Sequence, residues 1–595
     1  MRGVLGSIQP LAGGSAREPP LVPSPGASTR QYFQDAGYSE SRARAKAEEV
    51  RRGSELRQQK GVYPENRSCQ DVGWVLLFFV VFLAMLSLSV YYQVRFITHP
   101  PTFGPSTSDF EGRPHNSPPH VPGNGAHLAG PYSPRGSHNA AVTHLRHLAA
   151  VVGPKSTGAH DDISGLIDVN QLARLLLTTS FVAGAGGILV VYPFLLLAHK
   201  YANTVVHIAL ILGPVSMIIS GVSMLAASLV GGEFAAMLFI MGFLCLAFGV
   251  CSLALVMCRW GQLIPFTVRV VKVVAGVAKR FPALLLAPLL GGFVGNLWVL
   301  MSGMVFLGVA SDHYQMMQQS SSDPDITKAQ VYGAVFVMAL VLYWGVEVAH
   351  CLSHVTICGV YGQWYFGKDV GRSKTAVVLS SLKVALVTSF GSICLGSFLV
   401  AFIRGVEAVA RQIELDARRN ENRVLQCLAV VVRCVLGCIG DILEYFNEWA
   451  YVQCAIRGVG FFQAAKITYS ICTLANVRYI MSSWLVGNVV WLGALFSAVV
   501  GGLLGALVGL ASGSAIGAQA GLVIGFASAF ASGRAAMCVI SSGTKTILTC
   551  WAESPATLRE KEDAEEAELA EDFERPRRWV SSGGVLMNSR PEGEA

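Results

Sequence analysis

Ten long apolar segments constrain this chain more than any other feature of its sequence. A bilayer core of about 30 Å needs roughly 20 consecutive apolar residues of helix, and ten segments reach that length. Their approximate limits are 72–95, 172–197, 204–230, 234–257, 282–310, 331–357, 376–403, 425–446, 484–510 and 516–540. The expected fold is therefore all-α, a polytopic membrane helical bundle with about ten transmembrane helices.

The composition agrees with a membrane protein rather than with several soluble domains. Hydrophobic residues make up 52% of the 595 positions and charged residues only 14%. The net charge of +7 comes from Lys and Arg beside apolar segments, where they mark cytoplasmic ends, so nucleic-acid binding is not expected. The 14 Cys lie mostly inside apolar stretches and none lies between residues 95 and 171, so a disulfide framework is not expected either.

An even number of spans places both termini on one side of the membrane. Lys and Arg concentrate before the first span, in the connection 259–280 and around 368–374, which predicts that these parts and both termini are cytosolic. The acidic connection 311–330 fits the opposite side. The connection 404–423 carries five Arg but falls outside in this scheme, so it does not fit and the limits of the eighth span stay open.

The regions outside the membrane differ in composition. Residues 1–70 are polar and lack the apolar core of a signal peptide, so we expect a disordered cytosolic tail before a first transmembrane helix at 71–95. Residues 96–171 are rich in Pro and His, which predicts a disordered extracellular or luminal loop. Irregular His spacing disfavours a metal site there. A nine-helix transmembrane core is expected at 172–550, and an acidic cytosolic tail or helix at 551–595.

Several sequence blocks resemble the choline transporter-like family, especially its fungal and protist branch. The matching strings are Tyr343-Trp344, Glu347-Val348, His354-Val355-Thr356, Gly359-Val360-Tyr361-Gly362-Gln363-Trp364-Tyr365, Thr388-Ser389-Phe390-Gly391-Ser392, Tyr445-Phe446-Asn447-Glu448-Trp449-Ala450-Tyr451, Ala464-Ala465-Lys466 and Cys550-Trp551-Ala552-Glu553-Ser554-Pro555. The resemblance covers roughly 172–558, with a weaker match at 71–74. It implies ten spans, a large first outside loop, cytosolic termini and transport of choline or a related organic cation.

The chain departs from the family pattern at two places. The string Arg457-Gly458-Val459-Gly460-Phe461 stands where the family usually has Tyr-Gly-Lys-Ser-Phe. Lys545 stands in the closing helix where an apolar or acidic residue is more usual. Both departures bear on the identity of the substrate more than on the fold.

Ionisable side chains inside the sixth apolar segment are the principal candidate binding residues. A charged carboxylate such as Glu347 costs at least about 3 kcal/mol at the bilayer centre, so a compensating partner is required. Polar and aromatic residues at spacings of three and four place one stripe on a single helical face, which should look into the bundle. The stripe consists of Trp344, Glu347, His350, Cys351 and His354.

Two interpretations of this stripe remain open. In the first, it binds an organic cation: Trp344 and the neighbouring Tyr343 offer ring faces worth roughly 0.5–2 kcal/mol each, and Glu347 offers charge. His350 or His354 then tunes protonation. In the second, Glu347 makes an interhelical hydrogen bond or salt bridge, paired with His350 or with Lys383 of the next span.

Two further groups of polar residues admit similar alternatives. On the eighth segment the candidates for a second cation-facing stripe are Asp441, Glu444, Asn447 and Tyr451, with Glu448 at the same spacing. A solvated or Arg-paired face, with Arg433 as a possible partner, is the alternative interpretation. Asp71 and Trp74 are interpreted as a helix start and an interfacial aromatic residue.

Small residues repeat through the last two apolar segments. In lipid, Gly at every fourth position lets another helix backbone approach closely, so this series is expected to be a packing device, although helix sliding is conceivable. The series is Gly501, Gly505, Gly509, Gly513, Gly517, Gly521 and Gly525. The amphipathic stretch 264–280 is expected to lie on the cytosolic leaflet, where each basic residue adds about 1 kcal/mol of attraction to anionic lipid.

The sequence favours a transporter over an enzyme. It contains no Walker A string, no His-Glu-x-x-His and no Gly-x-Ser-x-Gly, so we expect no enzymatic activity, no cofactor and no resident metal. The partners expected are the lipid bilayer and a small organic cation. A non-transporting membrane scaffold and a carrier of ethanolamine or another amine are the alternatives. The plasma membrane is the expected location, an organelle membrane is possible, and the oligomeric state is open.

Overall fold

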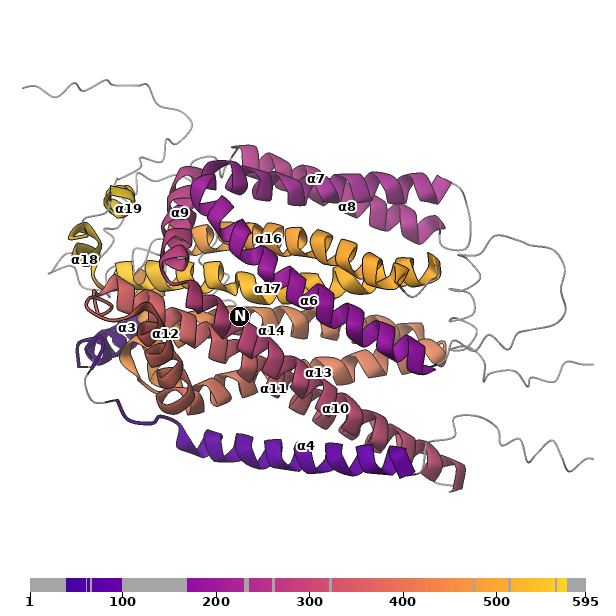
Figure 1. Ribbon diagram of the computed structural model, residues 1–595. Helices are drawn as coiled ribbons and strands as arrows, with labels where there is room; N and C mark the ends of the chain where they lie inside the picture. The colour runs from indigo at the N-terminus through magenta and orange to yellow at the C-terminus, as the bar shows by residue number, and fades with distance from the viewer. Residues whose placement is uncertain are drawn as a thin grey trace, which may run out of the picture. The chain divides into compact units, whose positions relative to one another are not determined.

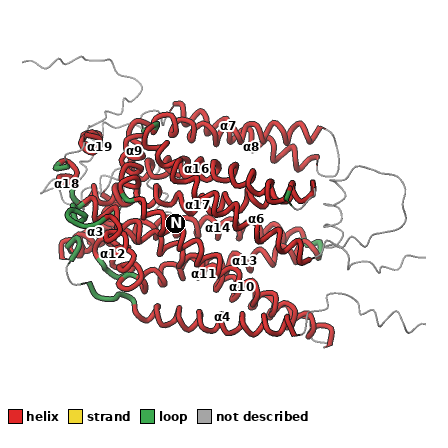
Figure 2. Tube along the Cα trace, in the orientation of Figure 1, coloured by secondary structure: helices red, strands yellow, loops and turns green. Residues whose placement is uncertain are grey.

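The computed structural model describes residues 39–59, 61–64, 67–98, 169–229, 235–258, 263–319, 324–474, 477–511, 515–561 and 564–574. The described part consists of helices joined by loops and turns, as Figure 2 shows. Ten helices are long and apolar enough to cross a membrane, which confirms the expected all-α polytopic bundle. The 13 described cysteines are all free.

Figure 1 shows the described helices. In chain order they are α3 (Glu40–Gln59), α4 (Val72–Thr98), α6 (Val169–Lys200), α7 (Ala202–Leu229), α8 (Ala235–Cys258), α9 (Ile264–Arg280), η3 (Pro282–Leu285), α10 (Leu286–Gln319), α11 (Pro324–Tyr365), α12 (Lys374–Lys383), η4 (Val384–Thr388), α13 (Phe390–Arg419), α14 (Arg423–Arg457), α15 (Phe461–Leu474), α16 (Val477–Leu510), α17 (Ala515–Glu553), α18 (Pro555–Arg559) and α19 (Ala564–Glu574). The chain divides into two compact units, Met1–Arg95 with Leu175–Ala595, and Phe96–Arg174. Every contact described below lies within the first unit.

Helix α11 is the centre of the packing. It contacts α10, α13, α14 and α17, and its C-terminal half is almost wholly buried, with Tyr361, Trp364 and Tyr365 among the largest buried side chains. At 42 residues it is about 63 Å long, roughly twice the thickness of a hydrocarbon core. Val348 and Val355 are buried as well, so α11 is enclosed on more than the one polar face that the sequence predicted.

The seventh predicted span, 376–403, is broken in two. Helix α12 ends at Lys383, a π-helical turn follows at Val384–Thr388, and the crossing helix α13 begins at Phe390. The break is held by buried Ser389, whose amide bonds to Val384 O and whose hydroxyl donates to Cys454 O at 3.2 Å. The Ser389 amide bonds to a carbonyl five residues back, and its hydroxyl bonds to a neighbouring helix. Hydropathy reports neither bond, so it could not locate the interruption.

The Arg-rich connection 404–423 is helical. Helix α13 continues to Arg419 and α14 starts at Arg423, so only residues 420–422 join them. Arg404 pairs with Glu407 of its own helix at 3.1 Å and with Asp441 of α14 at 2.5 Å. Most of these Arg residues therefore lie on helices, and Arg404 is paired with acids. For this reason, treating them as unpaired loop charges placed an Arg-rich connection on the outside.

The glycine series brings α16 and α17 together. These two helices share the most extensive contact between any two described helices. A Cβ on Gly505 would collide with Gly521 O, and a Cβ on Gly509 would collide with Gly517 O. Gly501 and Gly525 face each other in the same way, while Gly513 lies outside the described residues. This is the close backbone approach that the packing interpretation requires.

The expected disorder of residues 1–70 is wrong for the described residues of that range. Residues 40–59 form α3, which buries Ala43 and Val50 with Ala47 against Tyr469 of α15. The mean polarity of the segment concealed these small apolar residues, which recur at helical spacing on one face. In Figure 1, α3 lies at the same end of the unit as α9, α12, α18 and α19, so both described chain ends lie there, as an even number of spans requires.

The acidic C-terminal segment packs on α9 rather than remaining a solvated tail. Lys272 of α9 pairs with Glu565 of α19 at 3.1 Å, and Arg269 donates to Glu568 O at 3.3 Å. The apolar face of α9 is buried, including Val270, Val271 and Val274. Part of the basic face assigned to anionic lipid is therefore occupied by α19. The His-rich loop 96–171 lies almost wholly outside the described residues.

Candidate functional site

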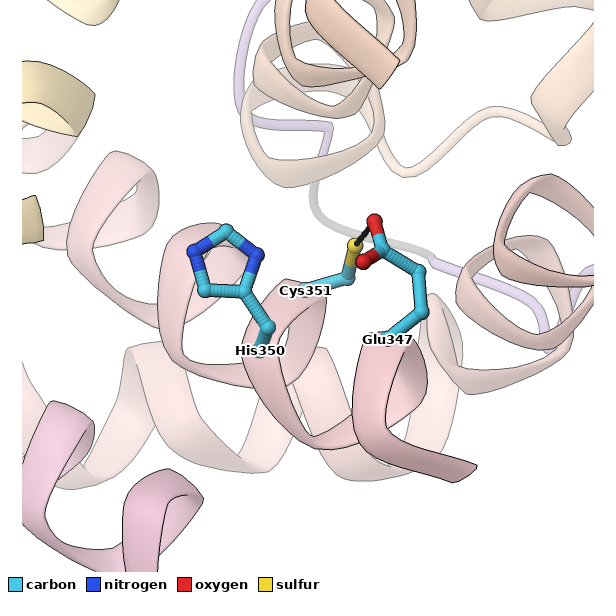
Figure 3. A group of neighbouring side chains, drawn as sticks. All are labelled: Glu347, His350 and Cys351. Carbon is cyan, nitrogen blue, oxygen red and sulfur yellow. Dashed lines mark hydrogen bonds between the residues drawn. The ribbon is translucent and has the colours of Figure 1, made fainter. Parts of the chain in front are cut away.

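Three potential ligand side chains gather on one turn of α11 (Figure 3). Glu347, His350 and Cys351 follow one another at helical spacing, and one ligand atom of each lies within 4.8 Å of the others. The Cys351 thiol donates to Glu347 Oε1 at 3.2 Å, and the imidazole stands beside the thiol. Cys351 is buried, while Glu347 and His350 are half-buried. The predicted stripe therefore has a polar centre at this turn.

One turn further along, His354 joins three helices. Its Nδ1 lies 2.7 Å from Ser542 Oγ of α17, and its Nε2 lies 2.8 Å from Glu448 O of α14. The imidazole is 1% exposed. Since Glu448 O can only accept, Nε2 carries the proton of a neutral ring and Nδ1 accepts from Ser542. His354 thus fixes the spacing of α11, α14 and α17 beside the Glu347 cluster.

Lys545 forms a buried ion pair with Glu448. The ammonium of α17 contacts the Glu448 carboxylate of α14 directly, and its nitrogen lies 5.2 Å from the centroid of the Tyr445 ring. The Lys545 side chain is 6% exposed. A carboxylate and an aromatic ring are the groups that hold an organic cation, so Lys545 occupies such a pair of groups with the chain's own ammonium.

Trp344 and Tyr343 were predicted to offer ring faces to an organic cation, but their positions favour a different role. The Trp344 ring is 2% exposed and packs edge-on against Phe78 and Phe398, each with centroids 5.3 Å apart. Its Nε1 donates to Cys394 O at 2.9 Å. Tyr343 is 45% exposed and so does not face the bundle interior. Trp344 serves as an aromatic packing centre, and a ring for a bound cation has to come from another helix.

Helix α14, which packs against α11, contributes buried aromatic and amide groups. Tyr451 is fully buried, its ring centroid lies 6.4 Å from that of His354, and its hydroxyl donates to Ile393 O at 3.3 Å. Asn447 Nδ2 donates to Gly396 O at 3.0 Å. Buried polar atoms without a hydrogen-bond partner in the described structure also gather on these helices, and they are Ser397 Oγ, Tyr445 OH, Asn447 Oδ1 and Trp449 Nε1. Such unpaired groups are costly unless something fills them.

Asp441 and Glu444 are paired with Arg. Arg404 lies 2.5 Å from Asp441 and 3.4 Å from Glu444, while Arg433 pairs with Glu414 of α13 at 3.0 Å. The Arg-paired interpretation therefore describes these two acids, with Arg404 as the partner in place of Arg433. Asn447 and Tyr451 lie deeper, beside the cluster.

The segment before the first span crosses the ends of several core helices. Asp71 accepts from Ser392 Oγ at 2.7 Å and from the amide of Phe461, the first residue of α15, at 2.9 Å. Its carboxylate thus caps the positive end of α15 rather than its own helix. Trp74 packs on Phe398 with centroids 5.0 Å apart, so it faces the bundle instead of the interface.

Arg67 and Tyr63 also bind the segment before the first span to the core helices. Arg67 donates to Ala455 O and Ile456 O, both at 2.9 Å, and so satisfies carbonyls at the C-terminal end of α14. Tyr63 OH donates to Gly359 O at 3.1 Å, and burial raises the pKa of this phenol well above its ordinary range. We call residues 61–64 and 67–71 the N-terminal strap. It covers the ends of α11 and α14 and the start of α15.

Glu347 differs from the other carboxylates of the described spans in having no Lys or Arg partner. Glu448 pairs with Lys545 and Glu553 with Arg457, the latter at 2.5 Å. The carboxylates of α13 and the outer part of α14 pair with Arg404, Arg419 or Arg433. Glu347 is accompanied by the Cys351 thiol and the nearby His350.

Sequence reasoning found one side of this site and missed the other. It singled out the α11 stripe by spacing, but it gave no role to Ser397, Ser542 or the Glu448–Lys545 pair. These residues come from helices distant along the chain. The unusual Lys545 was the one signal that could have revealed the pair, because a cation in a span requires a buried partner.

Comparisons with known proteins agree on one family. A family model described as plasma-membrane choline transporter matches residues 243–556, which include every residue of the α11 cluster. Protein PNS1 of Gibberella zeae is 30% identical over 246 residues, 40% of this chain and 44% of the relative. Protein PNS1 of Yarrowia lipolytica is 28% identical over 249 residues, 40% and 43% of the two chains.

A CTL-like protein of Dictyostelium discoideum is 26% identical over 240 residues, 40% of each chain. The chain thus aligns with less than half the length of each of these three relatives.

Proposed function

The chain belongs to the plasma-membrane choline transporter family, and from that premise we propose that it carries choline or a related monovalent organic cation across the membrane. It is an integral membrane protein with ten candidate spans. The family supports a transport role, and the substrate is argued from the side chains of the core. The relatives' names do not specify what they carry.

The charge of the core carries the proposal. Among the described carboxylates inside the spans, Glu347 alone makes no ion pair with Lys or Arg. An isolated carboxylate in a low-dielectric interior is unfavourable, and one positive charge restores neutrality. A ligand of charge +1 therefore fits this site better than a neutral or anionic solute.

Aromatic groups around Glu347 favour an organic cation over a bare metal cation as the transported species. A quaternary ammonium has no N–H group to donate, so it is held by ring faces and diffuse charge, worth roughly 0.5–2 kcal/mol per ring. In our proposal Tyr451, whose ring packs beside His354 of the stripe, supplies a ring face for the cation. Trp344 and Tyr343 contribute to the packing around the site. His350 and His354 border the site.

The N-terminal strap supports a state closed toward the side that we assign to the cytosol. Transport by alternating access needs one end of the path closed while the other is open. Asp71, Arg67 and Tyr63 tie the strap across α11, α14 and α15. We propose that release of the strap accompanies opening of this end, that both termini are cytosolic, and that the plasma membrane holds the protein.

Uptake into liposomes tests the proposal. Purified full-length protein would be reconstituted and the entry of labelled choline measured with and without an inside-negative potential. A potential of 100 mV supplies about 2.3 kcal/mol for one charge, enough for roughly 40-fold accumulation without a coupling ion. Ethanolamine and the uncharged carbon isostere of choline serve as competitors. Saturable, potential-dependent entry that the uncharged isostere does not inhibit would support the proposal.

Absence of entry for every amine tested would contradict transport and favour the scaffold interpretation. Entry of the uncharged isostere at the same rate would contradict the charge argument. Preferential entry of ethanolamine would support the transport mechanism but would identify ethanolamine rather than choline as the substrate.

A further inference from the structure

We infer that Glu347, His350 and Cys351 form a binding site for one soft divalent metal ion such as Zn²⁺ or Cd²⁺, which competes with the organic cation for Glu347. Competition rests on the proposed function, but metal binding does not, because it is measured without any transport substrate. The inference starts from the donor set on one turn of α11 (Figure 3).

The donor set selects the metal. Thiolate, imidazole and carboxylate together are the ligands of Zn²⁺ and related ions, whereas Mg²⁺ and Ca²⁺ prefer oxygen ligands alone. Zinc is commonly held by three side chains with a fourth position left for water or another ligand. The cluster supplies three such side chains from a single rigid helix, so little chain ordering is needed on binding.

The spacing of the atoms suits a single ion. Around a tetrahedral Zn²⁺, sulfur and oxygen ligands lie about 3.5 Å apart, and Cys351 Sγ already lies 3.2 Å from Glu347 Oε1. All three ligand atoms lie within 4.8 Å of one another. His350 is half-buried, so its side chain is not locked in place by close packing on every side.

A second observation points to a ligand at this place. Ser397 of α13 is fully buried, interacts with Cys351, and its hydroxyl lacks a hydrogen-bond partner of normal geometry in the described structure. A water molecule in the fourth position of the metal would hydrogen-bond this hydroxyl. The metal-bound water would thus give this buried hydroxyl a hydrogen-bond partner of good geometry.

The charges balance when the metal binds. The Cys351 thiol loses its proton to solvent, so the thiolate and the Glu347 carboxylate carry two negative charges against the two positive charges of the ion. His350 binds as the neutral imidazole. A monovalent organic cation needs only the Glu347 charge, and the thiol then keeps its proton. The same carboxylate therefore serves either occupant, but not both at once.

Titration of purified full-length protein with CdCl₂ tests the inference. Thiolate ligation to Cd²⁺ produces an ultraviolet charge-transfer absorption, which should saturate at about one equivalent of tightly bound metal in the wild type. Cys351→Ser should abolish this tight component, and His350→Gln should weaken binding by about 100-fold or more, beyond the usual effect of an outer-sphere partner.

A matched control separates this site from other thiols. Cys434 and Cys438 are exposed and lie one turn apart on α14. Neither belongs to a group of potential metal ligands among the described residues. The double variant Cys434→Ser/Cys438→Ser should keep the tight component. The inference is overturned if the wild type shows no tight component, or if Cys351→Ser titrates like the wild type.

X-ray absorption at the zinc edge adds a test that needs no variant. The wild type loaded with one equivalent of Zn²⁺ should show one sulfur and otherwise nitrogen or oxygen ligands, and an environment with no sulfur or with several would contradict the assignment. In liposomes, Zn²⁺ should inhibit choline entry competitively. Metal binding without choline entry would leave this inference standing and contradict the proposed function, so the two failures are distinguishable.

Discussion

Lys545 of α17 pairs with Glu448 of α14 inside the bundle, and its ammonium lies 5.2 Å from the centroid of the Tyr445 ring. Lys545 thus neutralises the Glu448 carboxylate, whereas Glu347 has no Lys or Arg partner. Because the Lys545 ammonium is covalently tethered, it cannot be exchanged for a substrate without moving α17. In our proposal, Lys545 therefore reduces the number of mobile cations that the core can accept.

Loss of Lys545 should destabilise the protein more than loss of the whole pair. Lys545→Met leaves the Glu448 carboxylate buried without a counter-charge, which costs about 3–5 kcal/mol in comparable buried pairs. Lys545→Met/Glu448→Gln removes both charges and should recover much of the loss. The midpoint of thermal unfolding of the purified variants measures this difference. Equal midpoints for the single and double variants would show that the pair carries no coupled charge.

Glycine at the α16–α17 contact should be far less replaceable than glycine elsewhere on the same helix. Gly505→Ala places a Cβ against Gly521 O and should cost about 1–3 kcal/mol through strain. Gly487 on α16 has no neighbour within 4 Å of an added Cβ, so Gly487→Ala is the matched control. Thermal unfolding should rank Gly505→Ala well below both the control and the wild type. A Gly505→Ala midpoint equal to that of the control would contradict the packing account.

The N-terminal strap should control access to Cys454. Cys454 is buried near the end of α14 and interacts electrostatically with Asp71. Asp71→Asn weakens the bonds to Ser392 and the Phe461 amide, each worth about 1.5–3 kcal/mol with a charged acceptor. The labelling rate of Cys454 with a maleimide should therefore rise.

Arg44→Ala is the control for this experiment, because Arg44 lies exposed on α3 and pairs only locally with Glu40. Labelling should not change in that variant, and Cys454→Ser identifies the signal. A labelling rate unaffected by Asp71→Asn would mean that the strap does not guard this end of the bundle.

The membrane architecture was predictable from the sequence because each span must be apolar over its own length. Segments 72–95 and 484–510 were predicted almost to the residue, at Val72–Arg95 and Leu485–Leu510. The interrupted start of α13 was not, since the break at Ser389 depends on its bond to Cys454 O. Hydropathy reports the solvent around a helix and not the partner that a particular residue meets.

The candidate site was predictable on one helix only. Helical spacing placed Glu347, His350 and Cys351 on one face before any contact was known. Spacing along α14 could not show that Glu448 meets Lys545, 97 positions away, while Glu444 meets Arg404. Which acid lacks a Lys or Arg partner depends on tertiary packing, so only the structure distinguishes Glu347 from Glu448.

Uptake of choline by Glu347→Gln liposomes tests the central claim most directly. Glu407→Gln is the matched control, because Glu407 is also a carboxylate of a spanning helix but shares Arg404 with two other acids. The account predicts that potential-driven entry is lost, or its apparent affinity falls at least about tenfold, in Glu347→Gln, a change of about 1.4 kcal/mol or more. The Glu407→Gln control should keep wild-type entry. Entry with unchanged rate and affinity in Glu347→Gln would contradict a cation site at this carboxylate.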